Sequence, residues 1–97
     1  YCWGYNAEGY VGDGTPSLRY SPTLVTGSGS GSLVFTRLTS GSTACAMNAM
    51  GAVYCWGLGG YVGDGTTSNR FTPTLVSGSG IDPRVFSDIG GNCAIIN

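Results

Sequence analysis

The feature that most constrains this chain is a motif that occurs twice. YCWG stands at residues 1–4 and again at 54–57, and GYVGDGT stands at 9–15 and again at 60–66. Repetition at a fixed period indicates that one supersecondary unit is built twice and that the two units pack against each other. The other matches are Arg19 with Arg70, PTLV at 22–25 with 73–76, Val-Phe at 34–35 with 85–86, and Ala-Cys-Ala at 44–46 with Asn-Cys-Ala at 92–94.

A period of about 50 residues with several short apolar runs is typical of β-propellers, in which each repeat supplies one four-stranded antiparallel blade. We therefore expect an all-β fold with about two propeller blades that belong to a larger ring or array. The first repeat spans residues 1–53 and the second spans 54–97. Eighteen Gly and an aromatic content of 11% favour short strands and tight turns over helices. A small two-sheet sandwich is the alternative fold.

Four segments, the last of which runs across the repeat boundary, are expected to form the strands of one blade. The runs ACAM and AVYCW within them are apolar without alternation, which is typical of strands that are buried on both faces. A blade that packs between two other blades has such strands. The four expected strands are residues 22–25, 33–39, 43–47 and 52–56.

The second repeat is expected to lack its final strand. Its third strand begins at Cys93, and the missing hairpin partner has the form Tyr-Cys-Trp-Gly, with which the chain begins. Because Tyr1 lies inside a motif, we expect the chain to be a processed or excised piece. Residues 1–4 of the same ring, or of an identical neighbouring chain, could supply the partner strand. Two isolated blades would expose apolar faces, so we do not expect a stable monomer.

Four cysteines allow three disulfide connectivities or a metal site. The chain has no close Cys pair and no His, which disfavours zinc. Residues 45–55 read as a hairpin with Gly51 in the left-handed position of a three-residue loop, which places Cys45 opposite Cys55. A non-hydrogen-bonded pair brings the two Cα atoms to about 4.5 Å, which suits a disulfide. We predict Cys45–Cys55, which leaves Cys2 with Cys93, within or between chains. Disulfides indicate an extracellular or cell-surface location.

The string Y-C-W-G-x-N-x-x-G-x-x-G-D-G-T, followed by R, P-x-x-V, F-x-x-I/L and G-x-x-x-C-A, resembles the repeat of the regulator of chromosome condensation family. The resemblance covers nearly the whole chain, twice, and implies blades of a propeller that in this family is typically seven-bladed. The chain departs from the pattern in three places. Thr43 stands nearest to a frequent His of the family, the stretch GGNCA at 90–94 is shortened, and the Asn of YCWGYN becomes Gly in YCWGLGG.

Each repeat carries one Asp-Gly pair, at Asp13-Gly14 and Asp64-Gly65. The glycine fits a turn that needs a positive φ. The arginine of the same repeat could pair with the aspartate, and a solvated arginine is the alternative. A calcium site would need about six to eight oxygen ligands, which one Asp per repeat cannot supply. We therefore expect no metal.

The aromatic residues fall at matching positions in the two repeats. Trp3 and Trp56 are expected to fill the space between neighbouring blades, with a sugar-binding platform as the alternative. Tyr10 and Tyr61 stand where the family often has Gln, so the resemblance makes them candidates for a contact surface.

The composition argues against several functional classes. The chain has no His, no Lys and no nucleophile elbow, and its five acidic residues are scattered, so we expect neither an enzyme nor a cofactor. Four arginines at a net charge of −1 form no basic stripe for nucleic acid. No apolar run reaches the about 18 residues that a membrane span requires.

We expect a non-catalytic extracellular repeat module with a structural or protein-interaction role, which assembles head-to-tail by strand complementation into a ring or filament. Its partners are copies of itself or further repeats of the same chain. The alternative is a fragment of a longer seven-bladed propeller that acts as a scaffold for a protein or a glycan. Guanine-nucleotide exchange, the activity for which the family is named, is the least favoured reading because the charged partner-binding loops are absent. The Ser- and Thr-rich loops could carry O-linked sugars, whereas no N-x-S/T sequon occurs.

Overall fold

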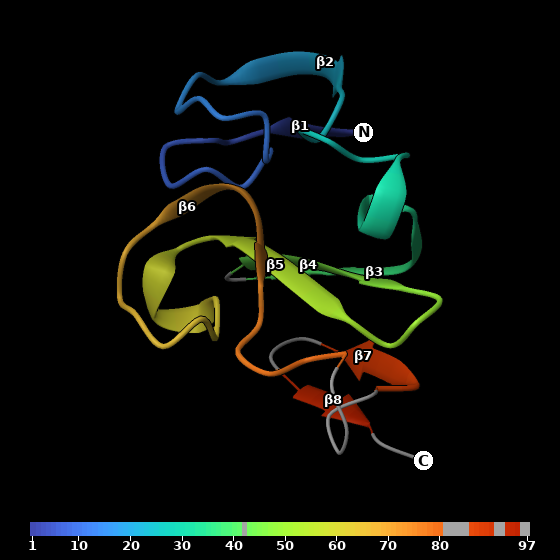
Figure 1. Ribbon diagram of the computed structural model, residues 1–97. Coiled ribbons are helices and arrows are strands. Elements are labelled where there is room, and N and C mark those ends of the chain that lie inside the picture. Colours follow the sequence, from blue (N-terminus) through green and yellow to red (C-terminus); the bar gives the residue numbers. More distant parts are fainter. Residues whose placement is uncertain (42, 81–85, 91–92, 96–97) are drawn as a thin grey trace.

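The computed structural model describes residues 1–41, 43–80, 86–90 and 93–95 (Figure 1). Within these ranges the chain is mostly β, with no α-helix and nothing helical that is long and apolar enough to cross a membrane. Two single 3-10 turns, η1 (Gly31–Leu33) and η2 (Gly59–Tyr61), are the other regular elements. The strands are β1 (Cys2–Gly4), β2 (Arg19–Thr23), β3 (Phe35–Ser40), β4 (Thr43–Asn48), β5 (Val53–Gly57), β6 (Arg70–Leu75), β7 (Asp88–Gly90) and β8 (Cys93–Ile95).

The strands form three antiparallel sheets. The central sheet has four strands in the order β3-β4-β5-β6, whereas among the described residues β1 pairs only with β2 and β7 pairs only with β8. The two small sheets lie on opposite sides of the central sheet (Figure 1). The described residues thus contain one four-stranded antiparallel sheet of the expected kind, and they do not form a closed propeller.

The strands of the central sheet differ from the set that we expected. Residues 22–25 were expected to open this sheet, but Pro22 and Thr23 belong to β2, which pairs with β1. The fourth strand is instead β6, which comes from the second repeat. The reason lies in the GDGT loop, which turns the chain back along the YCWG strand. The sheet therefore crosses the boundary between the repeats near residue 53.

The two small sheets reproduce the two halves of the central sheet. Cys2 pairs with Thr23 in β1-β2, and the matching Cys55 pairs with Thr74 in β5-β6. Likewise Gly90 pairs with Cys93 in β7-β8 as Thr39 pairs with Cys45 in β3-β4. The sequence repeat is therefore also a repeat of strand register. Val85 and Asn92 of the repeat alignment lie outside the described residues, as do 96–97 and part of the GGNCA stretch.

The two inner strands of the central sheet, β4 and β5, are buried on both faces. One face carries Ala44, Ala46 and Trp56, which cluster with Val25 from the first repeat. The other face carries a second cluster, against which Phe86 and Ile89 pack beside β7: Cys45, Met47, Val53, Cys55 and Val62. All six residues of β4 are buried. The apolar runs therefore form strands with two covered faces, as their lack of alternation predicted.

The β4-β5 hairpin has the register that the cysteine spacing predicted. Cys45 lies opposite Cys55, and the two form a disulfide with their Cα atoms 4.1 Å apart. Gly51 has a φ of +83°, as the three-residue loop requires. Asn48, whose role the cysteine spacing did not indicate, also holds the turn: its Oδ1 accepts hydrogen bonds from the backbone N–H groups of Met50 and Ala52 at 3.0 Å. This disulfide joins a cysteine of the first repeat to one of the second.

The close contact between the repeats at Gly12 leads to a stability prediction. A Cβ at Gly12 would lie 2.7 Å from Trp56 Nε1, whereas a Cβ at Gly29 would meet nothing within 4 Å, and both glycines have a positive φ. Gly29→Ala should cost only the left-handed strain of about 1–2 kcal/mol. Gly12→Ala should lose a further 1–3 kcal/mol or so through overpacking. Urea unfolding compares the two variants, and equal losses would contradict the tight fit around Trp56.

Candidate interaction site

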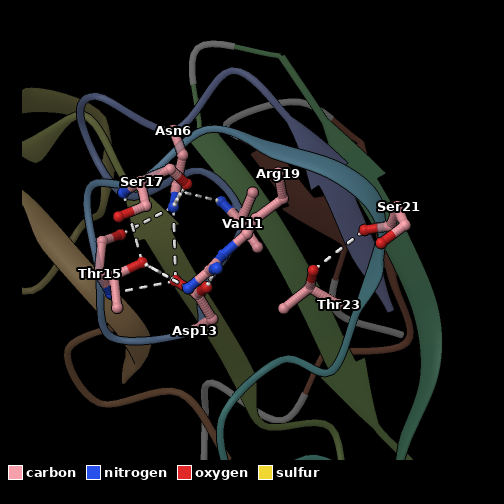
Figure 2. A network of polar contacts seen from close by, with 8 residues as sticks. All are labelled: Asn6, Val11, Asp13, Thr15, Ser17, Arg19, Ser21 and Thr23. Atoms are coloured by element: carbon pink, nitrogen blue, oxygen red, sulfur yellow. Dashed lines mark hydrogen bonds and ion pairs between the residues drawn. The ribbon is translucent and has the colours of Figure 1, made fainter.

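The GDGT segment of the first repeat folds around one carboxylate (Figure 2). Arg19 Nε donates to Asp13 Oδ2 at 2.6 Å, and the Thr15 N–H and hydroxyl donate to Asp13 Oδ1 at 3.0 and 2.8 Å. Gly14 has a φ of +83°, so the Asp-Gly turn has the expected geometry. This network fixes the loop that leads from β1 back to β2.

The second repeat builds the same loop. Arg70 Nε donates to Asp64 Oδ2 at 2.6 Å, and the Thr66 N–H and hydroxyl donate to Asp64 Oδ1 at 3.0 and 2.7 Å. Gly65 has a φ of +85°. Both arginines thus pair with the aspartate of their own repeat, and the solvated alternative is not what the structure contains.

Asn6 is a structural residue whose role the sequence motif did not indicate. It is 1% exposed, and its Nδ2 donates to the carbonyl oxygens of Thr15 and Ser17 at 2.8 Å (Figure 2). Its Oδ1 accepts from the Val11 N–H at 2.9 Å. The second loop is shorter and has no such residue; there the Gly59 N–H donates to Asn69 Oδ1 at 3.0 Å. The sequence signal for this role was that Asn6 follows the first YCWG segment, whereas a glycine stands at the matching position after the second.

The two aspartates have low pKa values. Burial by itself raises the pKa of Asp13, but hydrogen bonds from Thr15, Arg19 and Asn6 outweigh it and lower the pKa from 3.8 to about 2. Hydrogen bonds from Thr66 lower the pKa of Asp64 against the effect of burial. Each carboxylate is thus charged at neutral pH, and its hydrogen bonds are committed to its own loop.

Trp56 lies at the contact between the two repeats. It is 1% exposed, and its Nε1 donates to the Tyr10 carbonyl oxygen at 3.0 Å. The tight fit at Gly12 closes one side of the indole, and the Tyr10 ring lies against Gly57, where a Cβ would come within 2.8 Å of it. Residues 10–12 of the first repeat therefore form a slot for the tryptophan of the second. We call this the tryptophan slot.

Trp3 and Trp56 were both expected to fill the space between neighbouring blades; within the described residues only Trp56 does so, and the place of Trp3 stays a prediction. Trp3 is 63% exposed. The physical reason is that no segment among the described residues encloses Trp3 as residues 10–12 enclose Trp56. Tyr10 is half-buried inside the chain, whereas its counterpart Tyr61 is 45% exposed. Among the described residues, Trp56 thus lies in the tryptophan slot and Trp3 is exposed. Tyr61, which matches Tyr10 of the slot, is exposed as well.

Two apolar hollows lie on opposite faces of the central sheet. The first, of about 540 Å³, runs from β1 across β3 and β4, and we call it the β1 hollow. Its walls include Tyr1, Trp3, Leu38 and Ala44. The second, of about 180 Å³, lies between the β7-β8 sheet and the face of β4 and β5, and we call it the β8 hollow. Its walls include Val53, Tyr61, Val62, Val76 and Cys93.

The remaining cysteines are not bonded to each other in this chain. Cys2 is half-buried, Cys93 is exposed, and both are free. Burial raises the pKa of the Cys2 thiol, with a smaller opposing effect of the N-terminal charge. They belong to the two small sheets, which flank the central sheet from opposite sides (Figure 1). The intrachain form of the predicted Cys2–Cys93 bond is therefore absent, and the interchain form stays a prediction.

The site has the character of a contact surface. In the part of the chain that the structure describes, no group of three or more His, Cys, Asp or Glu side chains is placed to hold a metal ion. Four large exposed side chains around the β1 hollow are aromatic or aliphatic: Tyr1 at 74%, Trp3 at 63%, Tyr5 at 62% and Leu38 at 64%. No family model matches the chain.

The low pKa of Asp13 predicts how stability depends on pH. Because the pKa is lower in the folded chain, the carboxylate stabilises the fold above pH 3.8, and this contribution is lost as the pH falls through about 2. Asp13→Asn should lose about 1.5–3 kcal/mol at pH 7, as expected for hydrogen bonds to a charged group. It should also flatten the fall in stability between pH 4 and pH 2. Urea unfolding across this range checks both effects.

The exposed Asp88 offers a charge-matched control for the Asp13 variant. Asp88→Asn removes the same charge without touching the loop of Asp13, Thr15 and Arg19. Identical pH profiles of unfolding for the two variants would contradict the role given to the hydrogen bonds of Asp13.

Proposed function

We propose that this chain is a non-catalytic β-propeller-type repeat module whose copies assemble head-to-tail by strand complementation into a ring or filament. The observation that supports this most directly is the division of the sheets. β7-β8 matches the first half of the central sheet, and β1-β2 matches the second half. Placed edge to edge, β8 of one copy and β1 of another would complete a second four-stranded sheet.

Physical chemistry favours such pairing. An unpaired strand edge offers a row of backbone donors and acceptors to another strand. Contiguous exposed apolar side chains, like those around the β1 hollow, mark contact sites. The buried Cys45–Cys55 disulfide fits a chain that works in an oxidising compartment, which supports an extracellular or cell-surface location.

A second candidate function uses the same surfaces differently. In a longer propeller, further repeats of one polypeptide would cover β1 and β8, and the loops would serve as a scaffold for a protein or a glycan. The exposed aromatic residues of the β1 hollow support a glycan contact in that case. Guanine-nucleotide exchange has little support, since only nine residues, four basic and five acidic, carry charge in the whole chain.

The mass of the native chain in reducing buffer tests the proposal. We expect species at multiples of 9.9 kDa whose share rises with protein concentration. Leu38 is 64% exposed and lines the β1 hollow, so Leu38→Asp places a charge in the proposed contact. Because burying an unpaired charge is costly, this variant should associate only at an at least tenfold higher concentration. Light scattering after size-exclusion chromatography measures the shift.

Met50 provides the control for the Leu38 variant. It is 75% exposed at the tip of the β4-β5 hairpin and lines neither the β1 hollow nor the β8 hollow, so Met50→Asp should associate like the wild type. A folded wild-type monomer at every concentration would overturn the assembly. Equal effects of the two Asp variants would show that the association does not use the β1 hollow.

A further inference from the structure

We propose that the joint between two copies repeats, residue for residue, the contact that the two repeats make inside one chain. In this joint, β1 of a second copy pairs antiparallel with β8 of the first. Trp3 of the second copy enters a slot at Tyr61 and Gly63 of the first, and Cys2 of the second forms a disulfide with Cys93 of the first. The inference rests on the proposed function and gives its partner and geometry.

The tryptophan slot provides the template. Trp56 donates to the Tyr10 carbonyl and lies against Gly12 inside the chain. Advancing this contact by one repeat replaces Tyr10 and Gly12 by Tyr61 and Gly63, and replaces Trp56 by a tryptophan of YCWG. Trp3 is the tryptophan that this slot would receive from a second copy.

Both halves of the advanced contact are exposed. Trp3 is 63% exposed and Tyr61 is 45% exposed, whereas the matching Trp56 is 1% exposed. Glycines show the same difference. A Cβ on Gly57 would strike the Tyr10 ring, but a Cβ on Gly4 would meet nothing within 4 Å. The joint would bring the Tyr61 ring over Gly4.

Exposed aliphatic residues on β3 and β8 agree with this geometry. Met47 is 5% exposed in the cluster against which Ile89 packs, while the matching residues Ile95 and Leu38 are 60% and 64% exposed. The joint would place Ile95 of the first copy against Leu38 of the second. Each copy would thereby cover an exposed aliphatic residue of the other.

The charges along the joint are complementary. Arg37 of β3 lies 3.8 Å from Asp88 of β7, and the two residues occupy the same position in the repeat. This position carries a positive charge in the first repeat and a negative charge in the second. In the joint, Asp88 of the first copy would therefore lie beside Arg37 of the second. A like-charged pair at this position would have opposed the joint.

The register of the joint follows from β4 and β5. Cys45 and Cys55 face each other in that hairpin, and Cys93 and Cys2 occupy the matching positions of β8 and β1. Pairing in the same register brings the two free thiols to disulfide distance. As the bond forms, the thiols lose two protons and two electrons to an external low-molecular-weight disulfide, which is reduced to two thiols.

One pairing event would fill both hollows. The β8 hollow of the first copy lies over β5 and is flanked by Val62 and Val76, on the face where β1-β2 of the second copy would stack. The β1 hollow of the second copy lies over β3 and β4, where β7-β8 of the first copy would stack. The two surfaces are thus the two sides of a single interface, and the occupant that fits both is a second copy of this chain.

Two single-cysteine variants test the joint. Cys2→Ser retains Cys93, and Cys93→Ser retains Cys2, while both keep the Cys45–Cys55 disulfide. In a buffer of oxidised and reduced glutathione, each variant alone should give no covalent dimer, because its joints pair a serine with a cysteine. An equimolar mixture should give a disulfide-linked dimer, and the wild type should give a longer ladder.

Non-reducing electrophoresis and peptide mapping distinguish the outcomes. A Cys2–Cys93 peptide from the mixture supports the joint. Covalent dimers of either variant alone, in yields equal to the mixture, would overturn it. The joint is also wrong if light scattering shows assembly in reducing buffer but the mixture gives no covalent dimer; the proposed function then survives. Absence of assembly in both buffers removes the proposed function itself.

A glycine pair tests the tryptophan slot independently of the cysteines. Gly63 and Gly65 have φ values of +81° and +85°, so alanine strains both backbones alike. Only Gly63 would face Trp3 of a second copy. In reducing buffer, Gly63→Ala should shift the association to at least tenfold higher concentration than Gly65→Ala. Equal association of the two variants contradicts the slot, and an oligosaccharide that quenches Trp3 emission in the monomer would assign this face to a glycan instead.

Discussion

The pairing of β4 with β5 is the interaction on which the rest of the structure depends. β4 belongs to the first repeat and nearly all of β5 to the second, so this hairpin places both repeats in one sheet. The Cys45–Cys55 disulfide closes it covalently, and Trp56 on β5 then meets the loop at residues 10–12. Without this pairing, the described chain would consist of two-stranded ribbons, which are marginally stable alone in water.

Each face of the central sheet is covered over only half of its width. The loop of the first repeat covers β5 and β6 on one face, where the Gly14 N–H donates to the Phe71 carbonyl at 2.8 Å. β7 covers β3 and β4 on the other face. The two uncovered halves are the β1 hollow and the β8 hollow. This diagonal arrangement is a direct consequence of a repeat boundary that runs through a sheet instead of between sheets.

Sequence reasoning predicted the local features and missed those that depend on packing order. The Cys45–Cys55 pairing and the turn at Gly51 follow from one hairpin, so spacing alone was enough to predict them. The assignment of residues 22–25 to the central sheet was wrong because the same strands can be grouped into four-stranded sheets in two ways. The Asp13–Arg19 ion pair decides the grouping, since it holds the start of β2 beside the loop that follows β1.

The sequence could not predict which of the two matched tryptophans is buried, for another reason. Trp3 and Trp56 stand in identical YCWG segments, so composition and local pattern treat them alike. Their exposures differ because only Trp56 has a preceding repeat beside it in the described residues. Asn6 was missed because its three hydrogen bonds to backbone groups arise only once the loop closes. A repeat predicts which contacts can exist, and the neighbours present decide which of them form.

A chain whose described residues include two half-sheets has a particular way to associate. In the proposed joint, backbone pairing, tryptophan burial and the filling of both hollows all follow from one docking event, so partial docking would gain little. The rotation between successive copies then decides between a ring and a filament. A disulfide across the joint would add no new contact surface. It would convert an association that depends on concentration into one that also depends on the redox state of the surroundings.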